Sequence, residues 1–365
     1  MRVLVAPQEF KGSLTARAAA EAIAAGVRDA IPGAQIELLP LSDGGPGFLE
    51  ALQTSIGGEL VVVAAHDAIG RPSAASILMG SDGVAYVEAA QANALAHLLP
   101  GELAPLEAST FGVGELLRSA IAMGPAQIVV GVGGSASTDG GAGMAQALGA
   151  RLLDAASRDI APGGAALAAL DRVEWVRPEL PDVVVATDVT NPLLGPRGAA
   201  SVFGPQKGAS RTDVARLEAG LARFAEVIER DLGVDVRELP GAGAAGGLAA
   251  GLVAFLGARV ASGFELVAAS CGFAEKLAAA DLVITGEGSF DEQSRQGKTT
   301  GRVINAAVKA GKPWLVLAGR TSTNAEHAHA LGEVAGPSED PMTQADDWLR
   351  RLAAKVVGER PREGG

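Results

Sequence analysis

Polar and charged side chains gather in one segment near the end of the chain. Residues 281–302 read DLVITGEGSFDEQSRQGKTTGR, in which a short apolar strand is predicted to end in a turn at residues 285–288. This segment carries Glu287, Asp291 and Lys298. Carboxylates and a lysine just past the C-terminal end of a strand are what magnesium and nucleotide phosphates require, and open α/β sheets bind ligands at that edge. The segment therefore indicates an enzyme that acts on phosphates.

A second candidate site follows the first predicted strand. Residues 7–15 contain Lys11 beside a glycine, and Ser13 or Thr15 is the expected N-cap of the next helix. Free backbone N–H groups at a helix start, next to a lysine, form an anion site. A capped helix with a solvated lysine accounts for the same residues equally well, so both interpretations stay open.

The loop after the second predicted strand, at residues 41–47, combines a carboxylate with glycines. Glycines fill three of the four positions after Asp43, beginning with Gly44, and let the backbone approach a ligand closely. Asp43 then suits a metal ion or a hydroxyl group. A plain Asp-Gly turn is the competing explanation.

A glycine- and hydroxyl-rich loop at residues 131–141, GVGGSASTDGG, lies between a predicted strand and a helix predicted at residues 143–153. Such loops cradle phosphates in many unrelated nucleotide enzymes. A simple connection would not need so many small polar residues, so here we favour the binding interpretation. The candidate ligand-binding residues of this loop are Gly133, Gly134, Ser135 and Asp139.

A fourth loop, at residues 186–192, supplies hard oxygen ligands. Asp188 and Asn191 both offer side-chain oxygens, and Lys207 follows in a nearby polar segment. An Asx turn ahead of a proline would explain Asn191 alone. Among the histidines only His327 and His329 are close together, in a polar stretch predicted to be a solvated helix face. The chemistry is therefore expected to rest on carboxylates and lysines.

Composition sets the broad class of the protein. Of its 365 residues, 48% are hydrophobic but only 4% are aromatic, which suits a large core of small aliphatic side chains in an α/β fold. The formal net charge of −12 argues against nucleic acid or an acidic membrane as the main partner. Cys271 is expected to be a buried thiol. With no leader or membrane span in the sequence, we expect a cytoplasmic protein.

The predicted elements group into two α/β domains. Each end of the chain reads as a strand–helix–strand unit, at residues 3–39 and 282–318. We expect these units to share one layered, Rossmann- or flavodoxin-like sheet, formed by residues 1–55 plus 266–365. A second α/β domain with a mixed sheet is then inserted at residues 56–265, and turn signals indicate that its first strands are antiparallel.

Taken together, these loops resemble those of the bacterial glycerate kinase family, the type that phosphorylates glycerate at its 2-position. The matching stretches are FKGSL from Phe10, SDGGPG from Ser42, STFGVGELL from Ser109, GVGGSASTDGGAGMAQALGA from Gly131, TDVTNPLLGPRGAASVFGPQKGA from Thr187, GAGAAGG from Gly241 and TGEGSFDEQSRQGKT from Thr285. They keep the family order and span nearly the whole chain, which makes the set specific although each stretch is weak alone.

The resemblance implies two α/β domains with the active site in the cleft between them, ATP with Mg²⁺ as phosphoryl donor, and D-glycerate as acceptor. The expected anion contacts are Lys11, Ser13 and Lys298, and the expected magnesium ligands are Asp43, Asp188 and Glu287. Phosphoryl transfer also needs a base for the attacking hydroxyl. Asp188 is the first choice for this base and Asp291 the second.

Two departures from the family pattern concern the acceptor. Pro46 stands where glutamate is usual and Ser289 where arginine is usual, which removes charges near the expected site of an anionic acceptor. A kinase of another small hydroxy acid is therefore one alternative. An NAD-dependent hydroxyacid oxidoreductase that uses the glycines at residues 241–246 is a second, and a non-catalytic sugar-acid or nucleotide sensor is a third. The product, 2- or 3-phosphoglycerate, and the oligomeric state, a homodimer included, stay open.

Overall fold

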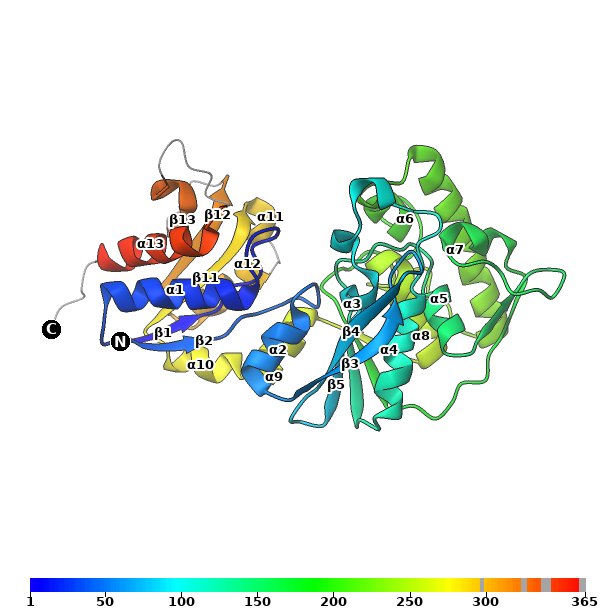
Figure 1. The fold of residues 1–365 in the computed structure, drawn as a ribbon, viewed down its shortest axis with the longest axis horizontal. Helices are drawn as coiled ribbons and strands as arrows, with labels where there is room; N and C mark the ends of the chain where they lie inside the picture. Colours follow the sequence, from blue (N-terminus) through cyan, green and yellow to red (C-terminus); the bar gives the residue numbers. More distant parts are fainter. Residues whose placement is uncertain (296–298, 323–326, 336–342, 361–365) are drawn as a thin grey trace. The chain divides into compact units, whose positions relative to one another are not determined.

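The computed structural model describes residues 1–295, 299–322, 327–335 and 343–360. These residues form two compact units (Figure 1). Unit 1 comprises Met1–Asp43, Glu50–Gly57 and Phe264–Gly365, and unit 2 comprises Gly44–Leu49 and Gly58–Gly263. Strands and helices occur together in both units, so the predicted α/β fold class is confirmed.

Unit 1 is built on a five-stranded sheet in which all strands are parallel. In spatial order the strands are β13 (Ala328–Ala330), β12 (Trp314–Thr321), β11 (Leu282–Phe290), β1 (Arg2–Val5) and β2 (Gln35–Leu38). Because β1 and β11 are neighbours, segments from the two ends of the chain share this sheet. The central strands are buried on both faces, as parallel strands covered by helices are.

Helices α1 (Ala16–Ala30) and α13 (Ala345–Gly358) run side by side and share one apolar core with the strands of unit 1 (Figure 1). In α1 the buried side chains, Ile23 among them, recur with helical spacing, which is the pattern of a core-facing helix. The helices approach closely at Gly26, where a Cβ atom would lie 2.1 Å from the carbonyl oxygen of Arg350. Glycine is therefore needed at this crossing.

Strand β11 is longer than predicted. Instead of turning after its apolar part, it continues in register with β12. A Cβ atom on Gly286 would lie 2.2 Å from the carbonyl oxygen of Leu317, and one on Gly288 would lie 3.1 Å from the backbone nitrogen of Lys11. The predicted turn at residues 285–288 is therefore wrong, because these glycines serve close backbone packing within a strand.

Unit 2 is built on a six-stranded mixed sheet. In spatial order the strands are β10 (Arg259–Ala261), β9 (Asp182–Ala186), β6 (Gln127–Gly131), β5 (Val84–Glu88), β4 (Pro72–Met79) and β3 (Glu59–His66). The first four run parallel, whereas β5, β4 and β3 are antiparallel to one another in turn, as predicted. Loops at the C-terminal ends of the four parallel strands therefore meet at one edge of the sheet.

Helices complete both units. Those of unit 2 are α3 (Ala90–Asn93), α4 (Phe111–Ala122), α5 (Ala142–Ala147), α6 (Ala199–Phe203), α7 (Arg211–Leu232) and α8 (Leu248–Leu256). The others are α2 (Phe48–Ile56), α9 (Gly263–Ser270), α10 (Phe273–Ala279), α11 (Glu292–Arg295) and α12 (Thr299–Lys309). Within the described residues, no helix is both long and apolar enough to cross a lipid bilayer.

Helix α5 is shorter than the helix predicted at residues 143–153. Gly149 takes a left-handed φ of +102°, a conformation that ends helices. The following residues form β7 (Arg151–Leu153), which pairs with β8 (Arg172–Glu174) in a separate two-stranded sheet. The second half of the predicted helix is therefore wrong.

The structure also tests the predictions for the histidine pair at residues 327 and 329 and for Cys271. His329 lies in β13, with His327 just ahead of it, so the helix predicted around them is wrong. Cys271 is buried, as predicted, and burial raises the pKa of its thiol. A raised thiol pKa disfavours the reactive thiolate, which agrees with a structural role.

Candidate functional site

The first group of candidate residues lies at the C-terminal edge of the unit 1 sheet. The chain leaving β1 continues alongside β11, where the backbone N–H of Gln8 donates to the carbonyl of Gly286 at 3.0 Å. The backbone of Lys11 then packs against Gly288. The predicted sites at residues 7–15 and 281–302 are thereby brought together in unit 1.

Lys11 occupies the exposed tip of a tight turn ahead of α1, where Gly12 takes a left-handed φ of +80°. Ser13 donates its hydroxyl to the carbonyl of Phe10 at 3.1 Å, which closes the turn. Thr15 rather than Ser13 is the N-cap of α1, because the Thr15 side chain accepts a hydrogen bond from the backbone three residues on. The Lys11 ammonium group is therefore accessible to an anionic ligand.

Carboxylates share this part of unit 1 with Lys11. Glu287, on β11, is buried and accepts a hydrogen bond from the side-chain amide of Gln8 at 3.0 Å. Burial raises the pKa of Glu9, while Lys11 opposes the rise and Asp43 adds to it. Lys11 and the exposed Asp43 therefore lie close enough to Glu9 to act on it electrostatically. A lysine and carboxylates at one sheet edge suit a phosphate ligand and a divalent cation.

Asp291 has a structural task at the end of β11. Its carboxylate accepts hydrogen bonds from the backbone N–H of Ser294 at 2.8 Å and from the Ser294 hydroxyl at 3.1 Å, which caps α11. Its role as an alternative base stays a prediction. Lys298 lies outside the described residues, and so does its predicted role.

The second group lies at the C-terminal edge of the parallel strands of unit 2. Residues 44–46 cross this edge, and Gly44 takes a φ of +94° there. A Cβ atom on Gly44 would lie 2.4 Å from the carbonyl oxygen of Ala186, the last residue of β9. The carbonyl of Gly44 accepts a hydrogen bond from the backbone N–H of Gly133 at 3.0 Å. The predicted loops at residues 41–47, 131–141 and 186–192 therefore meet here.

We call residues 133–141 the glycine–serine loop. Gly133 is half-buried and Gly134 is exposed, whereas Ser135 and Asp139 are buried. A ligand therefore reaches this loop at its glycine end. Small residues at that end allow a phosphate or ribose group to approach the backbone closely.

Asp139 fixes the buried end of the glycine–serine loop. Its carboxylate accepts hydrogen bonds from the backbone N–H and the hydroxyl of Thr110 at 2.8 and 2.9 Å, at the start of α4. It also accepts from the backbone N–H groups of Gly141 and Gly143 at 3.1 and 3.2 Å, at the start of α5. Asp139 therefore joins two helix starts, and the ligand binding that the sequence predicts for it stays a prediction.

Lys207 is buried against the glycine–serine loop. It is only 2% exposed, and its Nζ donates to the hydroxyl of Ser135 at 3.0 Å and to the carbonyl of Ser137. Burial lowers the pKa of this amine to about 7, although Asp139 acts in the opposite direction. A side chain this enclosed is placed to hold the loop, and the direct ligand binding that the sequence predicts for Lys207 stays a prediction.

Asp188 is the second residue after β9, at the same sheet edge. It is half-buried, and its Oδ1 accepts a hydrogen bond of 2.6 Å from the hydroxyl of Ser262, which follows the neighbouring strand β10. An oriented, partly exposed carboxylate suits a general base or a magnesium ligand. Asn191 instead donates its side-chain amide to the carbonyl of Arg197 at 2.7 Å, within its own loop.

The glycines at residues 241–247 pack behind these loops. The backbone N–H of Gly243 donates to the carbonyl of Asn191 at 3.0 Å, and a Cβ atom on Gly246 would lie 2.1 Å from the carbonyl oxygen of Ser137. The described residues just before this segment form no strand. The segment therefore lacks the strand–turn–helix context of a dinucleotide-binding motif.

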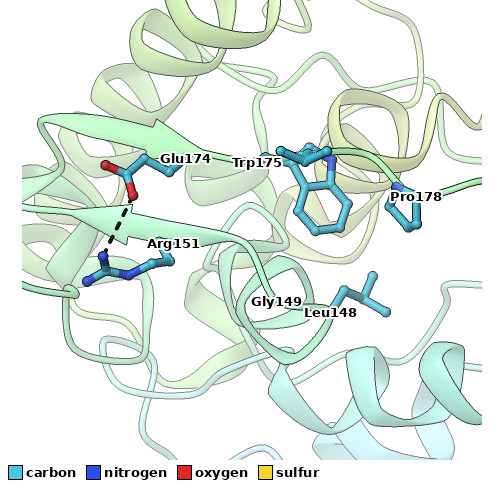
Figure 2. Close-up of a pocket in the computed structure, with 7 residues that line it drawn as sticks. Leu148, Gly149, Arg151, Glu174, Trp175 and Pro178 are labelled. Carbon is cyan, nitrogen blue, oxygen red and sulfur yellow. Dashed lines mark ion pairs between the residues drawn. The ribbon is translucent and has the colours of Figure 1, made fainter.

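A surface pocket of about 390 Å³ lies in unit 2, and none of the predicted site residues that the structure describes lines it (Figure 2). Arg151 and Glu174 form an ion pair of 3.6 Å at this pocket, and the indole N–H of Trp175 donates to the carbonyl of Phe255 at 3.0 Å. These polar groups therefore already have an ion-pair or hydrogen-bond partner within the protein. The pocket therefore adds no candidate catalytic group.

Four polar residues near the candidate sites were not predicted: Gln8, Glu9, Glu88 and Ser262. Glu88 is buried and accepts hydrogen bonds of 3.2 and 3.1 Å from two backbone N–H groups at the start of α2. It is the last residue of β5, and Ser262 directly follows β10. A polar residue at the C-terminal end of a strand was therefore the available signal for both.

Several known proteins are similar to this chain over most of its length. Residues 3–359 match the sequence profile of the glycerate kinase family. The glycerate kinase of Halalkalibacterium halodurans is 43% identical over 97% of both chains, and the glycerate 2-kinase of Escherichia coli is 43% identical over 91% of this chain and 88% of its own. The crystal structure of a protein described as glycerate kinase 2 from Salmonella typhimurium has a TM-score of 0.82 at 40% identity, covering 98% of this chain and 97% of that one. The resemblance seen in the sequence is confirmed, and the chain belongs to the glycerate kinase family.

Proposed function

We propose that the protein transfers the γ-phosphoryl group of ATP to D-glycerate. The observation that supports this most strongly is the similarity, along almost the full length, to bacterial proteins named glycerate kinase. The chemistry of the two groups of residues agrees with it. Unit 1 offers an exposed lysine among carboxylates, and unit 2 offers an open glycine loop beside an oriented carboxylate. That both groups serve one reaction is part of this proposal.

Asp188 is the proposed catalytic base. Because Ser262 holds one of its oxygens, the carboxylate is oriented before the substrate binds. It accepts the proton of the attacking hydroxyl while that oxygen bonds to the γ-phosphorus and the bond to ADP breaks. Lys11 is proposed to neutralise an anionic group of a substrate, and the glycine end of the glycine–serine loop is proposed to receive phosphate or ribose.

The carboxylates of the site fit a requirement for Mg²⁺. Within the residues that the structure describes, no three His, Cys, Asp or Glu side chains form a metal cluster. Mg²⁺ commonly takes only one or two carboxylates and completes its shell with water and substrate phosphates, so a full protein cluster is not needed. We propose Asp43 and Glu287, both in unit 1, as the residues that would hold it, so that Asp188 keeps the role of base. The ion would neutralise charge on the ATP phosphates.

An anionic acceptor needs a cation nearby, and Ser289 stands where the family usually has arginine. In the pairing of β11 with β12, the neighbour of Ser289 is Arg320, and both side chains are exposed. Adjacent strands lie about 4.8 Å apart, so a guanidinium group is available beside this position. Arg320 therefore supports an acceptor with a carboxylate, such as glycerate.

Two finer assignments complete the proposal. Phosphorylation at the 2-position is proposed because the Escherichia coli relative is named glycerate 2-kinase. Action in the cytoplasm is proposed because the single cysteine, Cys271, is a buried thiol, which fits a reducing compartment.

An assay of ADP formation from Mg-ATP tests the proposed activity. With D-glycerate we expect turnover of about 1–100 s⁻¹, as is usual for kinases, and loss of turnover when EDTA removes the metal. D-Lactate, L-glycerate and glycolate serve as competing acceptors. Turnover with one of these but not with D-glycerate would overturn the acceptor and keep the kinase, and no ADP formation with any of them would overturn the kinase.

A further inference from the structure

Lys207 is one of the largest fully buried side chains of the protein. It ends the short 3-10 turn η4 (Pro205–Lys207), after which Gly208 takes a left-handed φ of +93°. The side chain reaches the glycine–serine loop, where its amine contacts Ser135 and Ser137. Desolvating an amine is unfavourable unless it is hydrogen-bonded, so these contacts explain how the lysine is tolerated there.

The loop residues that Lys207 contacts are also held from other sides. The side-chain amide of Asn93 donates to the Ser137 hydroxyl at 2.9 Å, and the backbone carbonyl of Asn93 accepts from the backbone N–H of Ala136 at 2.8 Å. Gly246 packs against the Ser137 carbonyl, which leaves no room there for a side chain. This part of the loop is therefore enclosed, while the adjoining glycine end is accessible.

The lysine suits this place in either protonation state. Its pKa is lowered to about 7, and Asp139 is the nearby charged group that favours protonation. A neutral amine keeps two N–H donors, and the Ser135 hydroxyl and the Ser137 carbonyl accept both. Support of the loop therefore does not require a buried charge.

We propose that Lys207 is a positioning residue for ATP: its amine fixes Ser135 and Ser137 so that the glycine end of the loop is held in the conformation that receives the nucleotide. This inference rests on the proposed kinase function and on the loop as its nucleotide site. Because Lys207 acts through the loop, its loss weakens ATP binding more than it slows the chemical step.

Replacement of Lys207 by methionine tests this, because methionine keeps most of the side-chain volume and removes the N–H donors. Lys309→Met, at the exposed end of α12, is the matched control. In Lys207→Met we expect hydrogen exchange in residues 133–143 to rise about tenfold and the KM for ATP to rise about tenfold or more. The KM for D-glycerate should change less than about twofold, and the control should match the wild type in every readout.

Wild-type exchange in residues 133–143 together with a wild-type KM for ATP in folded Lys207→Met would overturn the inference. A loss of protection spread evenly over unit 2 would also overturn it, because that result indicates general stability only. If Lys207→Met does not fold, Ser135→Ala decides: raised exchange in this segment supports the inference, and unchanged exchange refutes it. Exchange needs no substrate, so failure of the kinase function is seen separately, as absent ADP formation by the wild type.

Discussion

Charged residues of the same type have different tasks in this protein. The carboxylates of Asp139 and Glu88 are buried and bind backbone N–H groups at helix starts. Asp188 is half-buried at a strand end and Asp43 is exposed, so both are placed to meet a ligand. Hydrogen bonds to helix starts therefore distinguish Asp139 and Glu88 from the candidate catalytic carboxylates, which residue type alone does not.

Replacement of Asp291 by serine separates its two candidate roles. Serine is also a good N-cap, so Asp291→Ser should keep the start of α11 and lose only the carboxylate. We expect its kcat to stay within about threefold of the wild type, whereas Asp188→Asn should lose about 100-fold or more. Steady-state kinetics and thermal melting of both variants measure this. A large loss of kcat in Asp291→Ser with unchanged melting would instead identify Asp291 as the base.

The buried Lys207 predicts a pH dependence of stability. Its pKa is about 7 in the folded chain, against an ordinary value of 10.5. Between these values the folded amine is mostly neutral and the unfolded amine is protonated, so unfolding takes up a proton and the free energy of unfolding rises with pH. Below about pH 7 both states are protonated, and above about pH 10.5 both are neutral, so this slope disappears outside the window.

Comparison with Lys207→Met isolates this contribution, because the other titrating groups are shared. From pH 7 to 10, the wild-type free energy of unfolding should gain up to about 1.4 kcal/mol per pH unit relative to the variant. Urea unfolding at a series of pH values measures the difference. Parallel curves for the two proteins would show that the folded lysine titrates normally.

At the scale of elements, glycines decide how closely the loops pack. Gly44, Gly133 and Gly246 bring backbone segments from separate parts of the chain into contact at one sheet edge. None of these positions has room for a Cβ atom. The glycine-rich motifs of unit 2 therefore build the site by close approach between loops, and only Gly134 is exposed on the glycine–serine loop.

Alanine substitution at two glycines separates crowding from backbone strain. Gly246 and Gly233 have similar left-handed φ values of +68° and +73°, but only at Gly246 would a Cβ atom meet other atoms within 4 Å. Gly233→Ala should cost about 1 kcal/mol of strain. Gly246→Ala should cost about 1–3 kcal/mol more, and it should raise the KM for ATP because it displaces Ser137. Equal unfolding free energies in urea would contradict this packing.

At the scale of the whole molecule, regular elements were predictable and tertiary partners were not. Helix α1 and strand β2 lie within the strand–helix–strand unit that the sequence predicts at residues 3–39, because apolar spacing is local information. The strand character of residues 285–288 was not predictable, because it depends on packing of Gly288 against the distant Lys11. The burial of Lys207 likewise depends on residues about 70 positions away in the sequence.

The same limit applies to the candidate site. A glycine next to polar residues is typical of both a ligand loop and a close backbone contact, and one sequence does not separate the two. The motifs were still sufficient to find the family, since their order along the chain is specific even though each is weak alone. What they did not reveal was which polar residues of each motif face a ligand.

Phosphorus NMR of the wild-type protein incubated with Mg-ATP and D-glycerate tests the proposed activity most directly, because it identifies both products without a coupling enzyme. We expect the β- and γ-phosphate signals of ATP to be replaced by those of ADP and by a phosphomonoester signal that coincides with added 2-phosphoglycerate. A signal that coincides with 3-phosphoglycerate would correct the position of transfer. Unchanged ATP, or ADP accompanied only by inorganic phosphate, would contradict a glycerate kinase.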